Sequence, residues 1–547
     1  MTDTTDTTEK LGTTGPAKTT GTKGSGWSPL RYSDFRRWWL AQLTSNVGSW
    51  MQTVAAQWVM TTLTSSAFLV GAIQGTNLPV LLLAVPGGVL GDLLNRKKLI
   101  IAGQAVMLAS AAALGALELA GLVTPAVLLI LLCGVGVGQG LTGPIAQTLQ
   151  PELVPASERP QAIALGAVNQ NLARAIGPAI GGLLLAATSA ALVFFVNAAS
   201  FLAVIGVVAI VSVPARVLTL PREHVREATV AGARFVRNSP ALLAIMVRAA
   251  AFAFFASGVW ALLPLVARHT LGLGSGGYGL LLGAVGIGAV LGATFSPAIR
   301  GALSPRALMA VCAAAIAACG AVLAVSHVAV IDAALLVLSG TGWILALGQL
   351  NASFQSTLPS WVKARGMAFY TVAFQGASGT GALTLGAVAQ ATSLDTGLLV
   401  LAGGLVVGAV ATFWLALPRP GQIDVTPAGA MPLPVIPEGP VGRVFVTVSY
   451  EVAPGNEQAF HAYSDRLKHF RQRTGGMHWG LYVDEQQPGR YLETFLVETW
   501  EEHERQHGRA TEHDANLLDE LDKLLVPGTH REGHHYLTAQ PRSRRRL

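Results

Sequence analysis

Charged side chains are scarce in this chain of 547 residues, of which Asp, Glu, Lys and Arg make up 12%. A typical soluble protein has about 25%. Only 24 charged residues lie between Ala41 and Leu417, whereas 30 lie between Arg443 and the C-terminus. Because a soluble fold needs a charged surface facing water, this shortage excludes a soluble enzyme for the first three quarters of the chain.

Cysteine is also rare, and the N-terminus has no apolar segment. Cys133, Cys312 and Cys319 lie inside apolar runs without metal-ligand spacing, so we interpret them as buried apolar side chains. Residues 1–33 are rich in Thr, Gly and Lys. They predict a disordered cytoplasmic tail rather than a cleavable signal peptide.

Long apolar runs fill the part of the sequence that lacks charge. A helix needs about 20 mainly apolar residues to cross the hydrocarbon core of a bilayer. Breaks at Gly, Pro and charged clusters predict twelve such helices, near 36–62, 67–91, 98–120, 124–148, 161–187, 190–213, 241–266, 277–299, 307–326, 329–356, 365–391 and 396–417. The sequence therefore predicts an all-α membrane protein with a small C-terminal α+β domain.

Lys and Arg are divided very unequally between alternate loops of these helices. One set of loops contains thirteen of them, and the opposite set contains Arg268 alone. Because cytoplasmic loops are enriched in Lys and Arg, we expect both termini in the cytoplasm. Membrane orientation accounts for the net charge of +7, so we expect membrane lipid and no nucleic acid as a partner.

A polar connector at 214–240 divides the membrane region into two groups of six helices. The expected order is a bundle at 34–213, the connector, a bundle at 241–417, a Pro-rich linker at 418–440, the α+β domain at 441–537 and a basic tail at 538–547. Two parallel repeats of six helices are typical of transporters, in which the substrate site lies between the repeats near the middle of the membrane.

The loop after the second predicted helix reads Gly88-Val-Leu-Gly-Asp92-Leu-Leu-Asn-Arg96-Lys97-Lys98. It resembles the G-x-L-x-D-x-x-x-R-K loop of the major facilitator superfamily. Gly88 would allow close approach of helices, and Asp92 could pair with Arg96 or with a helix N-terminus. We therefore predict a conformational latch formed by Gly88, Asp92, Arg96 and Lys97. The alternative is a basic loop that only sets the topology.

The fifth predicted helix contains Arg174-Ala-Ile-Gly177-Pro178-Ala-Ile-Gly181-Gly182. This string resembles the G-P-x-x-G-G motif of exporters in the same superfamily, where small residues allow tight packing and Pro softens the helix. A charge inside a span is costly and usually faces inward. Arg174 could therefore bind an anionic substrate or pair structurally with a polar neighbour.

Polar residues recur every three or four positions along the first predicted helix, which places them on one face. In lipid such a face must turn toward protein or water, and the resemblance implies that helices 1, 4, 7 and 10 surround a cavity. We predict a substrate cavity lined by Gln42, Asn46, Ser49, Trp50, Thr53, Gln57, Arg248, Gln349, Gln355 and Gln375. Interhelical hydrogen bonding remains the alternative for about half of them, and Arg248 could instead extend to the membrane interface.

Three further segments, Arg31–Phe35, Asn46–Gln52 and Ala261–Arg268, are similar to bacterial exporters of the enterobactin-exporter type, the transmembrane secretion effector group. This resemblance implies a proton-driven exporter of a siderophore, antibiotic or similar amphipathic molecule, working by alternating access in the plasma membrane. A general multidrug transporter is the alternative. The Arg found in helix 4 of many proton-driven drug exporters is missing from 132–140, so proton coupling follows from the resemblance alone.

The C-terminal region has the alternating pattern of a strand at Arg443–Tyr450, a helix near 454–473, two strands around 487–490, a helical segment at 500–525 and a last strand near 536. This βαββαβ order predicts a ferredoxin-like domain, similar to the antibiotic-biosynthesis-monooxygenase type, which often dimerises. We interpret it as a regulatory or dimerising domain. A second interpretation is an enzyme that modifies the solute before export.

The string His503-Glu-Arg-Gln-His507 in this domain matches the H-E-x-x-H motif of zinc proteases. A third ligand is not evident, although Glu512 and His513 follow. We therefore expect no metal site, no catalytic residue and no cofactor other than a proton gradient.

Overall fold

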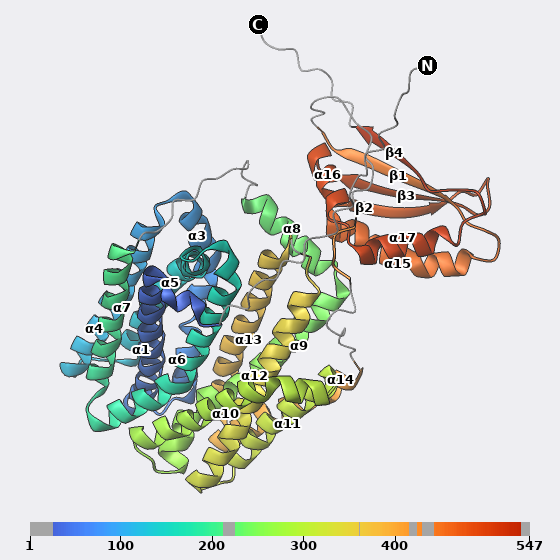
Figure 1. The fold of residues 1–547 in the computed structure, drawn as a ribbon. Coiled ribbons are helices and arrows are strands. Elements are labelled where there is room, and N and C mark those ends of the chain that lie inside the picture. The colour runs from blue at the N-terminus through green and yellow to red at the C-terminus, as the bar shows by residue number, and fades with distance from the viewer. Residues whose placement is uncertain (1–25, 212–224, 360, 415–423, 429–441, 538–547) are drawn as a thin grey trace, which may run out of the picture.

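The computed structural model describes residues 26–211, 225–359, 361–414, 424–428 and 442–537 (Figure 1). Most of the predicted N-terminal tail, much of the connector and linker, and the whole basic tail lie outside these ranges. The first group of helices comprises η1 (Ser28–Arg31), α1 (Ser33–Leu63), α2 (Ala67–Gly75), α3 (Leu78–Leu93), α4 (Arg96–Leu119), α5 (Pro125–Glu152), η2 (Ala156–Glu158), α6 (Arg159–Ala187) and α7 (Ala190–Ile210).

The second group follows a short helix, α8 (Val225–Arg237), which is separate from the spans. It comprises α9 (Pro240–Leu265), a π-turn η3 (Val266–Thr270), α10 (Ser275–Ala302), α11 (Pro305–Leu323), α12 (Ala329–Ser356), α13 (Lys363–Ala391) and α14 (Leu394–Trp414). Within the described ranges, eight helices are long and apolar enough to cross a membrane. The more polar α1, α6 and α13 are not among them.

The predicted helix at 67–91 is not continuous, so this prediction was wrong in its interior. The helix breaks between Gly75 and Leu78. Pro79, in the first turn of α3, has no backbone N–H to donate to Gly75. At the end of α2, the Ile73 carbonyl accepts hydrogen bonds from both the backbone N–H of Thr76 at 3.1 Å and the Thr76 hydroxyl at 2.6 Å.

The two groups of helices meet through α6 with α10 and α2 with α13. Glycines make these contacts close: a Cβ on Gly71 would lie 2.5 Å from the Ala382 carbonyl oxygen, and one on Gly182 would overlap the Cα of Gly279. Backbones can approach this closely only without side chains between them. The groups touch at one end and diverge toward the end that carries α8 (Figure 1).

We call the end where the two groups touch the closed end. Hydrogen bonds between the groups also join them there. Tyr278 of α10 donates its hydroxyl to Gln57 Oε1 at 2.6 Å, and the backbone N–H of Ala67 donates to Gln390 Oε1 at 2.8 Å. The loops at this end are those that the Lys and Arg count assigns to the outside. The open end is therefore the one predicted to face the cytoplasm.

The C-terminal domain is a four-stranded antiparallel sheet in the order β2-β3-β1-β4. Its elements are β1 (Val444–Glu451), α15 (Glu457–Thr474), β2 (Met477–Val483), β3 (Arg490–Val497), α16 (Trp500–Gly508), α17 (Glu512–Asp522) and β4 (Glu532–Leu537). The helical segment expected at 500–525 is divided in two, because Thr511 and Asp514 form a capping box that starts α17.

An ionic contact joins this domain to the membrane region. Glu502 of α16 accepts hydrogen bonds from Arg234 of α8 at 2.7 Å and from Arg509 at 2.6 and 3.1 Å. The Arg509 guanidinium also lies 4.6 Å from the ring centre of Trp361, in the turn between α12 and α13, and Trp361 packs edge-on against Phe235 of α8. We call Arg234, Trp361, Glu502 and Arg509 the docking contact.

Gly182→Ala is expected to destabilise the closed end, because the added methyl group meets backbone that cannot rotate away. Overpacking of this kind costs about 1–3 kcal/mol, which shifts a conformational equilibrium roughly 5- to 150-fold. Distances between spin labels at Thr188 and Thr392 should move to longer values. Gly206→Ala is the control, since a Cβ there meets nothing within 4 Å. An unchanged distance distribution in Gly182→Ala would contradict the proposed packing role.

Glu502→Gln is expected to release the docking contact and increase hydrogen exchange in α8. Loss of a hydrogen bond between these half-buried charged groups costs about 1.5–3 kcal/mol. Exposed Glu501→Gln is the matched control. Burial opposes ionisation of Glu502, but Arg509 and Arg234 outweigh it and lower its pKa. The docked state therefore has its full stability above the ordinary carboxylate pKa, and loses it as the pH falls through the lowered value. Equal exchange in both variants would show that the contact does not hold the domain.

Candidate substrate cavity

A cavity of about 380 Å³ lies where the two groups of helices meet. We call it the central cavity. Its walls come from both groups and are mainly polar, with aromatic rings on the side of the second group. It is lined by Asn46, Ser49, Trp50, Thr53, Val54, Gln57, Gln74, Asn77, Gln139, Gln170, Arg174, Pro178, Ser257, Trp260, Leu282, Trp343, Gln375 and Ser378.

The polar face of α1 turns toward this cavity, as the spacing of its residues predicts. Some of these side chains also bridge helices. Asn46 donates to Asn169 Oδ1 of α6 at 2.9 Å, and Gln57 donates to the Trp260 carbonyl at 3.3 Å. The Thr53 hydroxyl donates to the Ser49 carbonyl on its own helix at 2.9 Å. The stripe therefore both lines the cavity and joins α1 to α6 and α9.

Arg174 is the only charged residue among the described residues that line the central cavity. Its guanidinium carbon lies 5.6 Å from the ring centre of Trp50. Its Nε is buried and has no hydrogen-bond partner within the described ranges. A cation that stacks on an aromatic ring and lacks a carboxylate partner is a suitable contact for the negative group of a ligand.

Two aromatic residues of the second group, Trp260 and Trp343, also line the central cavity. The Trp343 ring packs edge-on against Trp260 at 6.2 Å and against Phe374 at 5.9 Å between ring centres. The sequence interpretation did not include these residues. The available signal was the position of Trp343 in the middle of an apolar run, because Trp in membrane proteins usually lies at the interfaces.

A second cavity of about 660 Å³ lies within the first group, between α1, α4, α5 and α6, and we call it the lateral cavity. It shares Asn46, Ser49, Gln139 and Gln170 with the central cavity. Gln42 lines this second cavity rather than the first. Further glutamines that the sequence interpretation missed also line it, namely Gln104, Gln147 and Gln150. Polar side chains thus continue from the central cavity toward the open end.

Besides Gln42, three residues predicted for the substrate cavity are not among the described residues that line the central cavity. Arg248 lines an apolar groove between α9, α11 and α14. It is nine residues from cavity-lining Ser257, which places it on the opposite face of α9 at 100° per residue. Gln349 is buried and donates to Ser353 Oγ on its own helix at 3.1 Å. Gln355 is exposed and absent from the described lining of both cavities.

The residues of the predicted exporter motif lie at the junction of three helices. A Cβ on Gly177 would be 2.6 Å from the Trp50 Cβ, and one on Gly181 would be 2.7 Å from the Met51 Cα, both in α1. Gly182 instead contacts α10, and Pro178 lines the central cavity. The motif thus positions α6, and with it Arg174, against α1.

The predicted latch is only partly described. Arg96 donates to Glu152 Oε2 of α5 at 2.9 Å, and Lys97 donates to the Ala209 carbonyl of α7 at 2.6 Å. The side chains at Gly88 and Asp92 lie outside the described residues, so the pairing of Asp92 stays a prediction. Glu152 was missed. The sequence could have indicated this pair, because Glu152 follows the fourth predicted helix on the same side of the membrane as the basic loop.

Comparison with solved structures gives the same fold at low identity. A bacterial homolog of the human lysosomal transporter Spinster, in an inward-facing and unoccupied conformation, matches with a TM-score of 0.58 and 14% identity, over 71% of this chain and 97% of that chain. A mutant form of the nucleoside transporter NupG matches with a TM-score of 0.57 and 14% identity, over 70% and 99%. A POT family transporter in complex with 5-aminolevulinic acid matches with a TM-score of 0.56 and 11% identity, over 70% and 95%.

No curated protein matches the sequence. The family model described as transmembrane secretion effector matches residues 24–543, which is nearly the whole chain and includes the C-terminal domain. The chain therefore belongs to the transmembrane secretion effector family and is a membrane transporter of the major facilitator type.

Proposed function

We propose that the chain is a secondary active exporter of an amphipathic small molecule, such as a siderophore or an antibiotic, across the bacterial plasma membrane by alternating access. The observation that supports this most is the central cavity, where Arg174 and Trp50 face polar and aromatic walls. In this proposal twelve helices span the membrane, with α2 and α3 together forming one span.

The described conformation gives a solute a route into the central cavity from one end. The two groups of helices diverge at the end that carries α8 and the C-terminal domain (Figure 1). The distribution of Lys and Arg assigns this end to the cytoplasm. A solute would enter the cavity from the cytoplasm and leave after the closed end opens. The G-P-x-x-G-G motif at Gly177–Gly182 agrees with export rather than uptake.

The chemistry of the solute follows from the lining. Trp50, Trp260 and Trp343 offer flat apolar surfaces, while glutamines and serines offer donors and acceptors. Arg174 adds one positive charge. This combination suits a partly polar ligand with an aromatic or aliphatic body and an anionic group. A general multidrug transporter would share the aromatic walls, but would not depend on a single cation.

A proton gradient is the proposed energy source, and Asp332 of α12 is our candidate for the group that carries the proton. Asp332 is fully buried in the first turn of α12, and neither of its carboxylate oxygens has a hydrogen-bond partner among the described residues. Ionisable residues inside membrane segments are costly and often form proton relays. Among the described residues that line the central cavity there is no carboxylate or imidazole, so the coupling site would be separate from the substrate.

The C-terminal domain is proposed to be a ferredoxin-like regulatory domain that can dimerise. Its sheet order and its position on α8 support this role, because the docking contact links it to the connector between the two groups of helices. A domain held at this place can respond to the relative movement of the groups. The enzyme interpretation would require turnover of a metabolite by the full-length protein.

Metabolite profiling would first identify a compound that appears in the medium only when cells make this protein. Arg174→Gln is expected to reduce export of that compound. Loss of a charged hydrogen bond of about 1.5–3 kcal/mol corresponds to an apparent affinity lower by roughly 10- to 150-fold. Arg174→Lys should retain part of the activity. Arg248→Gln serves as the control, because Arg248 lies outside the central cavity. Equal export by Arg174→Gln and the wild type would show that Arg174 does not bind the substrate.

Asp332→Asn is expected to abolish the response of export to an imposed proton gradient in inside-out vesicles, because the amide cannot gain or lose a proton in this range. Asp395→Asn, an exposed carboxylate at the start of α14, is the matched control. Vesicles that contain Asp332→Asn should show the same flux with and without an uncoupler. A flux that remains fully sensitive to the uncoupler would assign proton coupling to another group.

A further inference from the structure

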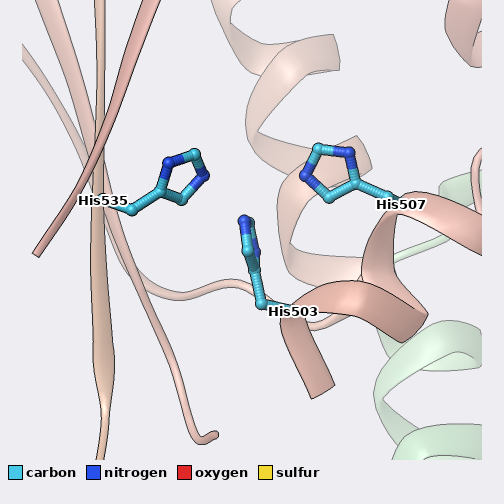
Figure 2. A group of neighbouring side chains, drawn as sticks. All are labelled: His503, His507 and His535. Carbon is cyan, nitrogen blue, oxygen red and sulfur yellow. The ribbon is translucent and has the colours of Figure 1, made fainter. Parts of the chain in front are cut away.

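Three histidines of the C-terminal domain converge on one point (Figure 2). His503 and His507 lie one turn apart on α16, and His535 comes from β4, across the interior of the domain. One ring nitrogen from each lies within 4.8 Å of the others. The sequence interpretation looked for a third ligand at Glu512 and His513. The structure instead brings His535 to this pair.

Two ring nitrogens of this histidine cluster are buried and have unmet hydrogen-bonding capacity. His503 is 1% exposed. Within the described ranges, His503 Nε2 and His507 Nδ1 are buried without a hydrogen-bond partner. A buried polar atom without a partner costs about 1–3 kcal/mol. The unpartnered Nε2 of buried His503, beside the imidazoles of His507 and His535, indicates that the cluster is arranged to bind a ligand.

The surrounding hydrogen bonds fix which nitrogen of His503 is free. The Thr474 hydroxyl donates to the Phe470 carbonyl, so its oxygen accepts a hydrogen bond from Gln506 Nε2 at 3.3 Å. The amide oxygen of Gln506 therefore faces His503 Nδ1 at 3.0 Å, and Nδ1 must carry the proton. His503 Nε2 is left with a lone pair. This is the arrangement in which a second residue orients a metal-binding imidazole.

We propose that His503, His507 and His535 form a binding site for a divalent first-row transition-metal ion of the zinc type. Imidazole nitrogens suit zinc, copper, iron and nickel, whereas magnesium and calcium require oxygen ligands. Two nitrogens about 2.05 Å from a tetrahedral zinc ion are about 3.3 Å apart. The three rings need to move together by on the order of 1 Å to reach this geometry.

Protonation and charge in the surroundings agree with this assignment. Burial lowers the pKa of His503 and of His507 to about 4. Both are neutral at pH 7, so a metal ion does not have to displace a proton from them. Arg471, a cationic side chain that acts electrostatically on both imidazoles, donates to Glu493 at 3.0 and 3.1 Å. The carboxylate of Glu493 balances the charge that would otherwise repel a metal ion.

The site differs from that of a zinc protease, although it includes the H-E-x-x-H string. The Glu of that motif acts as a general base beside the metal. Here Glu504 is exposed and accepts a hydrogen bond from Trp500 Nε1 at 2.9 Å. Three histidines leave a fourth position for water or another small ligand. A bound ion would tie α16 to β4, and α16 also carries Glu502 of the docking contact.

The test uses the full-length protein, purified in detergent without a polyhistidine tag and titrated with Co²⁺. One ion per chain is expected, with the visible absorption of a tetrahedral or five-coordinate site, and Zn²⁺ should displace it. His503→Ala, His507→Ala and His535→Ala should each abolish this one-to-one binding. Gln506→Leu should weaken it about 10- to 100-fold, the usual effect of losing a second-shell partner.

His534→Ala is the matched control. His534 is the neighbour of His535 on β4 and is exposed on the other face of the strand. Unchanged binding in this variant, together with loss in His535→Ala, would support the site. Absence of one-to-one Co²⁺ binding by the wild type would overturn the proposal without reference to any variant. Equal loss in His534→Ala and His535→Ala would overturn it as well.

Discussion

Contact between the backbones of α6 and α10 at Gly182 and Gly279 is the constraint on which the rest of the membrane region depends. Because neither residue has a side chain, the two groups of helices can close completely at one end. Closure at that end separates the groups at the other, and places the polar faces of α1, α6 and α13 around a shared cavity. Arg174 is brought to Trp50 by the same helix that makes the closing contact.

Polar groups in lipid need partners inside the protein, and this requirement explains where they lie. Along α1 they pair with α6 and α9 or line the cavities. Charged residues collect at the open end, where Arg96 contacts Glu152 and Arg234 contacts Glu502. The docking contact meets the same requirement outside the membrane region. In it, a half-buried charge of α8 pairs with a half-buried charge of the C-terminal domain.

The sequence predicts the helices well and the cavity in part. Regular spacing identifies the face of α1, because a helix repeats every 3.6 residues whatever surrounds it. The spacing of residues does not show how a helix is oriented relative to its neighbours. This is why Arg248, Gln349 and Gln355 do not line the central cavity, whereas Trp343, which was not predicted, does. His535 was missed for a related reason, because it comes close to α16 only when β4 pairs with β1. The local sequence does not predict which distant strands pair.

The central claim is that the closed end must open for solute to leave. Gly276 and Ala186 face each other there, and a Cβ on Gly276 would lie 3.0 Å from that of Ala186. The variant Ala186→Cys/Gly276→Cys should form a disulfide across the two groups of helices. Export should stop when the pair is oxidised and return after reduction, as followed by release of the dependent metabolite into the medium. Undiminished export by fully cross-linked protein would contradict alternating access.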